Sequence, residues 1–193
     1  MAVPYEGRID HTEDSIQALF QTQYNTYRFG RVLLTAAAGV ALVAVGLFAP
    51  MPLWGQALTT LAGCLLFVGR DFPAIVRSVK AVDARGGVLP TTVCVFGSGQ
   101  MELQEGGIHK KLNYRKVDRL VQDKKYLYLF LGPDSVIMVD RGKIENGSDE
   151  DVMQLVEKRT GKKWEEAFSL LTVNLHDLLR LWDRRKAAKQ KEK

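Results

Sequence analysis

VLLTAAAGVALVAVGLFAPMPLWGQALTTLAGCLLFVG, residues 32–69, contains no Asp, Glu, Lys, Arg or His. One helix of this length would be ~57 Å long at about 1.5 Å per residue, whereas the hydrocarbon core of a bilayer is about 30 Å thick. Pro50 and Pro52 lie near the midpoint, where a continuous helix does not tolerate proline. The stretch therefore predicts a transmembrane helical hairpin with spans at residues 32–49 and 53–69.

Basic residues flank this hairpin on both sides, and its turn carries no charge. Arg28 and Arg31 precede the first span, and Arg70, Arg77 and Lys80 follow the second. Because Lys and Arg beside a span stay on the cytoplasmic side of a membrane, we expect a multi-pass protein with both termini in the cytoplasm. The alternative is a re-entrant hairpin, which dips into the bilayer and returns without crossing it.

Small residues recur at helical spacing within both spans: Gly39, Gly46, Gly55, Thr59 and Gly63. Small side chains allow two helix backbones to approach closely in lipid. This candidate helix-packing face has two interpretations. It packs the two spans against each other, or it forms a surface for self-association.

The segments beside the hairpin are predicted to be helical. Residues 1–31 are interpreted as a cytoplasmic amphipathic segment, in which a helix at 12–29 is capped by Thr12. Residues 70–90 form a juxtamembrane linker, with a short basic helix at 74–84 that ends at a pair of glycines.

The polar part of the chain, residues 91–164, is predicted to fold as one domain of short strands. The strands are expected at 91–96, 100–104, 108–112, 125–131 and 136–139, and residues 114–121 form either a further strand or a turn. Ser148 is a candidate N-cap of a helix that Gly161 ends. The fold class is therefore α+β. An antiparallel sheet or partial barrel follows the hairpin, and one C-terminal helix closes it, as in pleckstrin-homology (PH) domains.

Two spans followed by this strand pattern resemble the YcxB-like family of bacterial membrane proteins, whose C-terminal domain is PH-like. The resemblance covers roughly residues 12–164. It rests on Gly107-Ile108 after a strand, on the stretch 114–121 leading into YLYLFL, and on a strand that ends just before an acidic helix start. Pro-Lys often follows that strand in the family, whereas this chain has Asp140-Arg141. The resemblance implies a bacterial inner-membrane location and assigns no activity or cofactor.

Residues 165–193 are predicted to form a second amphipathic helix with a basic tail, which docks either on the domain or on the membrane. The chain has a formal net charge of +5. Beside a membrane anchor, that charge favours an anionic lipid surface over nucleic acid as the partner. The candidate anionic-surface contacts are Lys110, Lys111, Arg115, Lys116, Arg184, Arg185 and Lys186.

The sequence contains no recognisable catalytic, cofactor or metal motif. Its two cysteines and three histidines are isolated from one another, without the spacing of a metal site. We therefore expect a non-catalytic protein that presents a binding or scaffold domain at the inner leaflet, with an unknown protein partner. The alternative is a self-associating component, such as a channel or a transporter accessory subunit; an enzyme is a third and weaker hypothesis.

Overall fold

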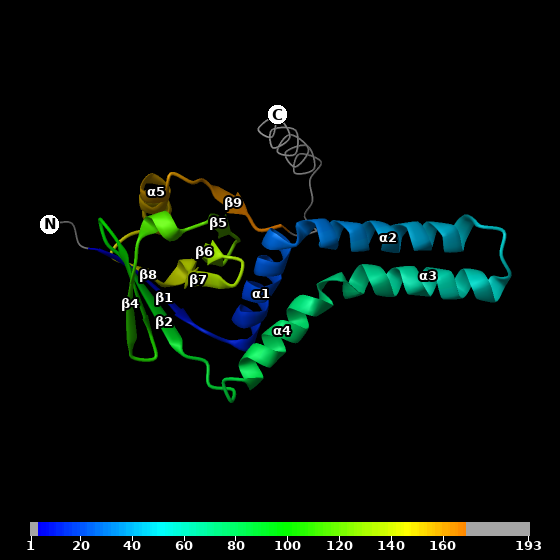
Figure 1. The fold of residues 1–193 in the computed structure, drawn as a ribbon, viewed down its shortest axis with the longest axis horizontal. Helices are drawn as coiled ribbons and strands as arrows, with labels where there is room; N and C mark the ends of the chain where they lie inside the picture. Colours follow the sequence, from blue (N-terminus) through cyan, green and yellow to red (C-terminus); the bar gives the residue numbers. More distant parts are fainter. Residues whose placement is uncertain (1–3, 169–193) are drawn as a thin grey trace.

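The computed structural model describes residues 4–168 and has an α+β fold in which a long apolar hairpin projects from two small sheets (Figure 1). The first half of the chain contains β1 (Tyr5–Asp10), α1 (Glu13–Tyr27), α2 (Phe29–Phe48), α3 (Leu53–Val68), η1 (Gly69–Asp71) and α4 (Phe72–Asp83). The second half contains β2 (Thr91–Phe96), β3 (Met101–Glu105), β4 (Ile108–Leu112), η2 (Tyr114–Lys116), β5 (Arg119–Gln122), β6 (Tyr126–Gly132), β7 (Ser135–Asp140), η3 (Arg141–Lys143), β8 (Ile144–Glu145), α5 (Asp149–Thr160) and β9 (Trp164–Glu166).

The first strand belongs to the sheet domain, although the hairpin separates it from the other strands in sequence. The five-stranded sheet has the order β4-β3-β2-β1-β8, and β1 is antiparallel to β2, with Tyr5 opposite Phe96 and Asp10 opposite Thr91. Residues 11–90 are thus inserted between two neighbouring strands. The helix expected at 12–29 is present as α1, so the helical interpretation of residues 1–31 is corrected only at Tyr5–Asp10. YEGRID is too short to reveal a strand whose partner lies so far along the chain.

The remaining strands agree well with the sequence predictions. β2 and β4 have the expected bounds, and residues 114–121 divide into η2 and the start of β5. Helix α5 has the expected capping box at Ser148, and Gly161 ends it in the left-handed conformation at φ 69°. The helix expected from residue 165 is wrong at its start, because Trp164–Glu166 pairs in parallel with β5 as strand β9. The rest of that predicted helix, and Arg184, Arg185 and Lys186 with it, lie outside the described residues.

The two sheets enclose a common core without forming a closed barrel. The second sheet has the order β7-β6-β5-β9, and its pairings are antiparallel except for β5 with β9. Phe96 and Met101 from one sheet and Leu127 and Leu129 from the other are almost completely buried in this core. Helix α5 adds Val152 and covers the open side of the core.

Helix α1 covers the other face of the second sheet and creates a second core. The alternating side chains of β6 serve both: Leu127 and Leu129 point into the first core, whereas Tyr128 and Phe130 point toward α1. Burial on both faces explains why YLYLFL lacks a polar face. The Tyr27 hydroxyl at the end of α1 donates to Asp118 over 2.7 Å.

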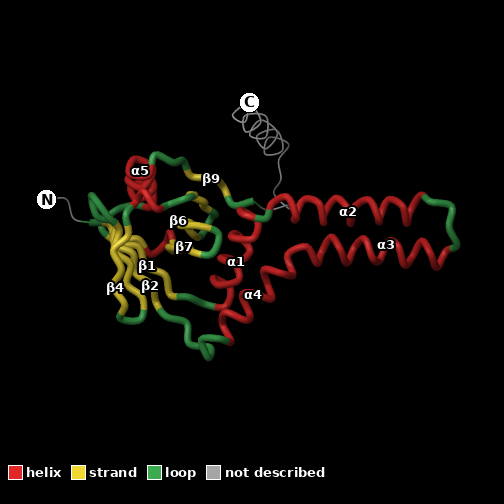
Figure 2. Tube along the Cα trace, viewed as in Figure 1, coloured by secondary structure: helices red, strands yellow, loops and turns green. Residues whose placement is uncertain are grey.

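Helices α1 and α4 pack side by side between the sheets and the hairpin (Figure 2). The chain passes from α1 into α2 through a single non-helical residue, Arg28. On the return it passes from α3 through η1 directly into α4. The sheet domain is therefore joined to the hairpin by two short helical connections, without a long flexible linker.

Candidate functional site

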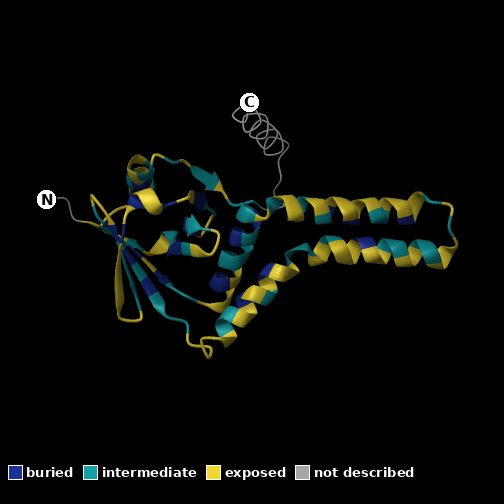
Figure 3. Ribbon diagram, in the orientation of Figure 1, coloured by how far each residue is buried: buried dark blue, intermediate teal, exposed yellow. Residues whose placement is uncertain are grey.

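The hairpin of α2 and α3 exposes its large apolar side chains and buries its small ones. Two helical stretches, Phe29–Phe48 and Leu53–Asp83, are long and apolar enough to cross a membrane, and only 22% and 11% of their most apolar windows are buried. The core helix of a soluble protein would be mostly buried. Leu34, Leu61 and Phe48 are 72%, 56% and 85% exposed (Figure 3). The hairpin therefore offers a continuous apolar surface to its surroundings.

Close contact between the two helices depends on glycine. A Cβ atom on Gly63 would lie 2.7 Å from both the carbonyl oxygen of Gly39 and the backbone nitrogen of Val43. One on Gly46 would lie 2.8 Å from the backbone nitrogen of Thr60. Such distances are below any normal carbon contact, and the neighbouring atoms are backbone. Three of the predicted packing residues thus lie between α2 and α3 of the same chain.

The other two predicted packing residues, Gly55 and Thr59, have their closest described contacts within their own helix and the hairpin turn. The nearest neighbour of a Cβ atom on Gly55 would be the Met51 side chain at 3.7 Å, within the turn of the hairpin. The Thr59 hydroxyl donates to the Gly55 carbonyl over 2.9 Å, one turn back in its own helix. The four-residue spacing predicted one face, but of its two glycines only Gly63 lies against the backbone of α2.

The basic pairs of the sheet domain lie far from the hairpin. Strand β4, which carries Lys110 and Lys111, is at the opposite end of the domain (Figure 1). Lys111 also forms an ion pair with Glu102 at 3.2 Å. Arg115 and Lys116 lie in η2, which contacts α5 at that same end. Lys110, Lys111, Arg115 and Lys116 therefore lie at the end of the sheet domain remote from the hairpin.

A partly buried charged pair lies where α3 ends, and the sequence did not reveal it. The side chains of Arg70 and Asp71 are 11% and 17% exposed and approach to 3.5 Å. Arg70 also lies over the Phe67 ring at 4.7 Å, and the Gln21 amide donates to Asp71 over 3.3 Å. Because α1 supplies Gln21, this cluster ties the base of the hairpin to the helix that covers the second sheet.

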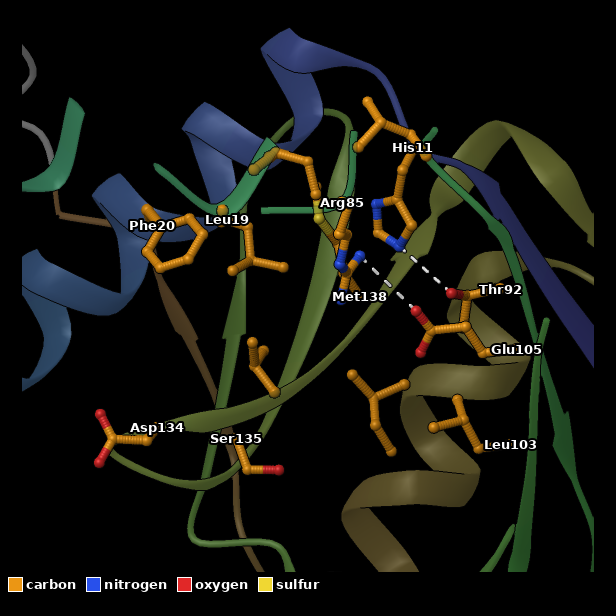
Figure 4. Close-up of a pocket in the computed structure, with 15 residues that line it drawn as sticks. His11, Leu19, Phe20, Arg85, Thr92, Leu103, Glu105, Asp134, Ser135 and Met138 are labelled. Atoms are coloured by element: carbon orange, nitrogen blue, oxygen red, sulfur yellow. Dashed lines mark hydrogen bonds and ion pairs between the residues drawn. The ribbon is translucent and has the colours of Figure 1, made fainter. Parts of the chain in front are cut away.

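A cavity of about 240 Å³ opens between α1, the segment after α4 and both sheets. Its polar end and its apolar wall are made by different elements (Figure 4). The labelled polar residues at one end are His11, Arg85, Thr92 and Glu105; Asp134 and Ser135 lie at the other end, and Leu19, Phe20 and Met138 are among the apolar lining residues.

The polar end of this cavity is largely satisfied within the protein. His11 Nε2 is 3.2 Å from the Thr92 hydroxyl, and Arg85 pairs with Glu105 at 3.7 Å. His11 Nδ1 is buried without a hydrogen-bond partner. Burial lowers the pKa of His11 below 6.5, and the nearby Glu105 carboxylate only partly opposes this effect. The imidazole is therefore neutral near pH 7, with one ring nitrogen unused.

His11 and Ser135, which both line the cavity, are not close to each other. Ser135 lies at the opposite end from His11 (Figure 4), so these two residues do not form a nucleophile and base pair. Residues 4–168 contain no group of three or more His, Cys, Asp or Glu side chains that could hold a metal ion. Cys94 is completely buried, which raises its pKa to about 12 and leaves the thiol unreactive.

Comparison with known proteins adds no assignment. No family model matches this sequence, and neither curated proteins nor solved structures yielded a match. The resemblance to the YcxB-like family therefore stays a hypothesis, and the function has to be argued from the geometry of the chain itself.

Proposed function

We propose that this chain is a bacterial inner-membrane protein whose α2–α3 hairpin spans the bilayer and holds a PH-like, non-catalytic binding or scaffold domain at the cytoplasmic face. The observation that carries the proposal is the insertion of residues 11–90 between the paired strands β1 and β2. An anchor placed inside a sheet fixes the domain to the membrane at two points.

The strand pairing supports the proposed topology. Tyr5 lies opposite Phe96 and Asp10 opposite Thr91, so both ends of the inserted segment return to the same sheet. An inserted segment that returns to its starting side crosses a bilayer an even number of times, which agrees with two spans. Arg28, Arg31 and Arg70 flank the hairpin at this side, and the positive-inside rule places such flanks in the cytoplasm.

The arrangement of sheets and helix supports the PH-like interpretation. Two small, mainly antiparallel sheets pack over one core, and α5 closes it with Val152 and Val156, both fully buried. The family resemblance implies the same plan. Lys110, Lys111, Arg115 and Lys116 lie at the end remote from the hairpin, where a soluble partner with an acidic surface can reach them.

The alternative, self-association through small residues, receives less support. Gly39, Gly46 and Gly63 are already in contact within the hairpin, so an oligomer built on this face would require α2 and α3 to separate. Self-association through the exposed leucines of the hairpin is the version of this alternative to test by experiment.

Cysteine accessibility tests the proposed topology. In the full-length Cys64→Ala background, Met51→Cys places a thiol in the hairpin turn and Ser98→Cys places one in the sheet domain. We expect a membrane-impermeant maleimide to label Met51→Cys only in right-side-out vesicles and Ser98→Cys only in inverted vesicles. Labelling of both positions from one side would favour the re-entrant hairpin, and extraction of the protein at alkaline pH would refute membrane integration.

Site-specific photocrosslinking tests the proposed role. A photoreactive residue at Ile108, which is 72% exposed on the remote edge strand, should capture a defined foreign protein. The matched position is Leu61 in the hairpin, at 56% exposure. Loss of the Ile108 product when Lys110 and Lys111 are replaced by Gln would support the binding domain. Capture of only the chain itself, at Leu61, would support the oligomeric alternative.

A further inference from the structure

Exposed apolar side chains continue beyond the hairpin into helix α4. Within residues 4–168, Val88 and Ile108 are the only exposed large apolar residues outside the hairpin and α4. Helix α4 contributes Phe72 at 62%, Ile75 at 38% and Val79 at 53% exposure. A short helix outside the hairpin thus carries three large apolar side chains that no part of the described chain covers.

These three residues form one face of α4, and a different face packs against the protein. Phe72, Ile75 and Val79 are spaced three and four residues apart, so they lie on one side of the helix. The buried positions, Ala74 and Ser78, are four residues apart on another side and are 1% and 4% exposed. Because α1 packs against α4, small residues allow its close approach while the apolar face points outward.

Lys80 flanks this outward face, whereas Arg77 lies farther round the helix, on the side away from Val79. Arg77 and Lys80 are exposed, and among the described residues neither forms an ion pair. An apolar stripe beside free cations is the pattern of a helix that lies at the surface of an anionic membrane, where the cations remain near the headgroups.

The position of α4 places this face next to the hairpin. Helix α3, η1 and α4 follow one another without a break, and Leu53–Asp83 forms one continuous helical stretch. Helix α4 leaves the end of α3 at an angle, so its first turn is nearer to the hairpin than its last (Figure 1). The exposed residues of α4 therefore continue the apolar surface of the hairpin beyond the end of α3.

We propose that the face of α4 formed by Phe72, Ile75 and Val79 lies in the headgroup region of an anionic leaflet, with Phe72 deepest and Val79 shallowest. This inference rests on the proposed membrane anchoring and adds to it a lipid-binding surface outside the spans. Lys80 contacts lipid phosphates at the edge of this face, and Arg77 adds positive charge to the same exposed turn of α4. Since α1 covers the second sheet and packs on α4, the leaflet orients the sheet domain through this pair of helices.

Depth-dependent fluorescence quenching tests this surface in the full-length protein. Single cysteines at Phe72 and Val79 in the Cys64→Ala background are labelled with an environment-sensitive fluorophore, after reconstitution into phosphatidylcholine vesicles with or without phosphatidylglycerol. Leu61→Cys in the hairpin is the membrane reference, and Lys110→Cys on the remote strand is the aqueous reference. We expect lipid-attached quenchers to act strongly at 61 and 72, more weakly at 79, and not at 110.

The charge contribution has its own matched variants. Arg77→Gln with Lys80→Gln should abolish the additional protection of position 79 that phosphatidylglycerol provides, because the free cations that hold this turn near the phosphates are lost. Lys110→Gln with Lys111→Gln removes the same charge at the remote end and should leave that protection unchanged.

The outcomes separate this inference from the proposed function. If positions 72 and 79 are as open to aqueous quenchers as 110 while 61 is protected, the α4 inference is overturned and the anchor stands. Protection of 72 and 79 from both kinds of quencher would mean that a protein, or a second copy of the chain, covers this face, which also overturns it. If 61 itself is open to water, the membrane anchor fails.

Discussion

Between α2 and α3 the residues in closest contact are Gly39, Gly46 and Gly63, whereas the two sheets meet through Phe96, Leu127, Leu129 and other large side chains. The hairpin keeps its leucines on the outside, and the sheet domain keeps them inside. Both parts of the chain are rich in apolar residues, so composition does not determine whether the large apolar side chains point inward or outward. The sheet domain follows the rule for proteins in water, where large apolar groups are buried, whereas the hairpin has the pattern expected of helices in lipid, which close backbone packing holds together.

The N-terminal ends of the helices also differ between the sheet domain and the hairpin. Helix α1 begins with a capping box of Thr12 and Ser15, and α5 begins with one of Ser148 and Asp151. Helices α2 and α3 have Arg28 and Pro52 as N-cap residues and no side-chain cap hydrogen bond. Caps satisfy backbone N–H groups where a helix begins, and the chain uses them on the helices that belong to the sheet domain.

Truncation of a buried and of an exposed leucine should separate the two parts of the molecule most clearly. Leu129→Ala in β6 removes a fully buried side chain from the first core and should lower the free energy of unfolding by about 2–5 kcal/mol. Leu61→Ala, at an exposed hairpin position, should change it by no more than about 0.5 kcal/mol. Urea unfolding of the detergent-solubilised protein, followed by tryptophan fluorescence, measures both. A comparable loss at Leu61 would mean that the hairpin surface is packed against protein.

Enlarging a glycine tests the packing within the hairpin. Gly63→Leu places side-chain atoms against the backbone of α2 and should destabilise the helix pair by about 1–3 kcal/mol, or separate it. Gly55→Leu is the matched control, because its nearest neighbour at 3.7 Å leaves room for a Cβ atom. Loss of helicity during SDS titration, measured by circular dichroism, reports the difference. Equal effects would contradict the contact between α2 and α3 described above.

Removal of one cap tests the difference between the helix ends. Ser148→Ala deletes the side chain that accepts a hydrogen bond from the Asp151 backbone, and should cost about 1 kcal/mol of domain stability. Ser98→Ala, in an exposed loop, should be nearly neutral. Thermal unfolding of the unaltered chain and of the two variants, all at one pH, measures the difference. An unchanged transition for Ser148→Ala would mean that α5 is held by its packing alone.

The smallest predicted effect concerns pH and His11. Its pKa is lower in the folded protein than its ordinary 6.5, so below about pH 6.5 the unfolded chain binds the proton more readily. Stability should therefore fall as the pH drops through this range toward the folded pKa, with Asp10, Glu105 and Arg85 as the neighbouring groups that act on the imidazole. His11→Gln should flatten the dependence of the unfolding temperature on pH. His109→Gln, on an exposed strand, should leave it as steep as in the unaltered chain.

Local patterns account for much of this fold. YLYLFL between turns predicted strand β6, and Ser148 with Gly161 predicted the limits of α5. These features depend on near neighbours in sequence. Strand β1 was missed because its stability comes from β2, which lies beyond the hairpin, and β9 was missed because it pairs in parallel with a distant strand.

The candidate site was less predictable for the same reason. His11 lies after β1, Arg85 after α4 and Glu105 at the end of β3, so only the assembled sheet brings them together. The glycine spacing predicted close packing of a helix but left its partner open, and only the contacts distinguish Gly63 from Gly55. The remote position of Lys110 and Lys111 follows from the order of strands, which no local pattern encodes.

The insertion of the hairpin between β1 and β2 also has a consequence during biosynthesis. A ribosome releases Tyr5–Asp10 first, and its partner Thr91–Phe96 follows only after the whole hairpin has been made. With the hairpin in a bilayer, β1 must wait for both spans to be threaded, and it finds β2 only if the chain has returned to the side from which it left. Completion of the sheet thus serves as a check on correct threading, and a chain that is threaded once is left with an unpaired first strand for quality-control proteases to recognise.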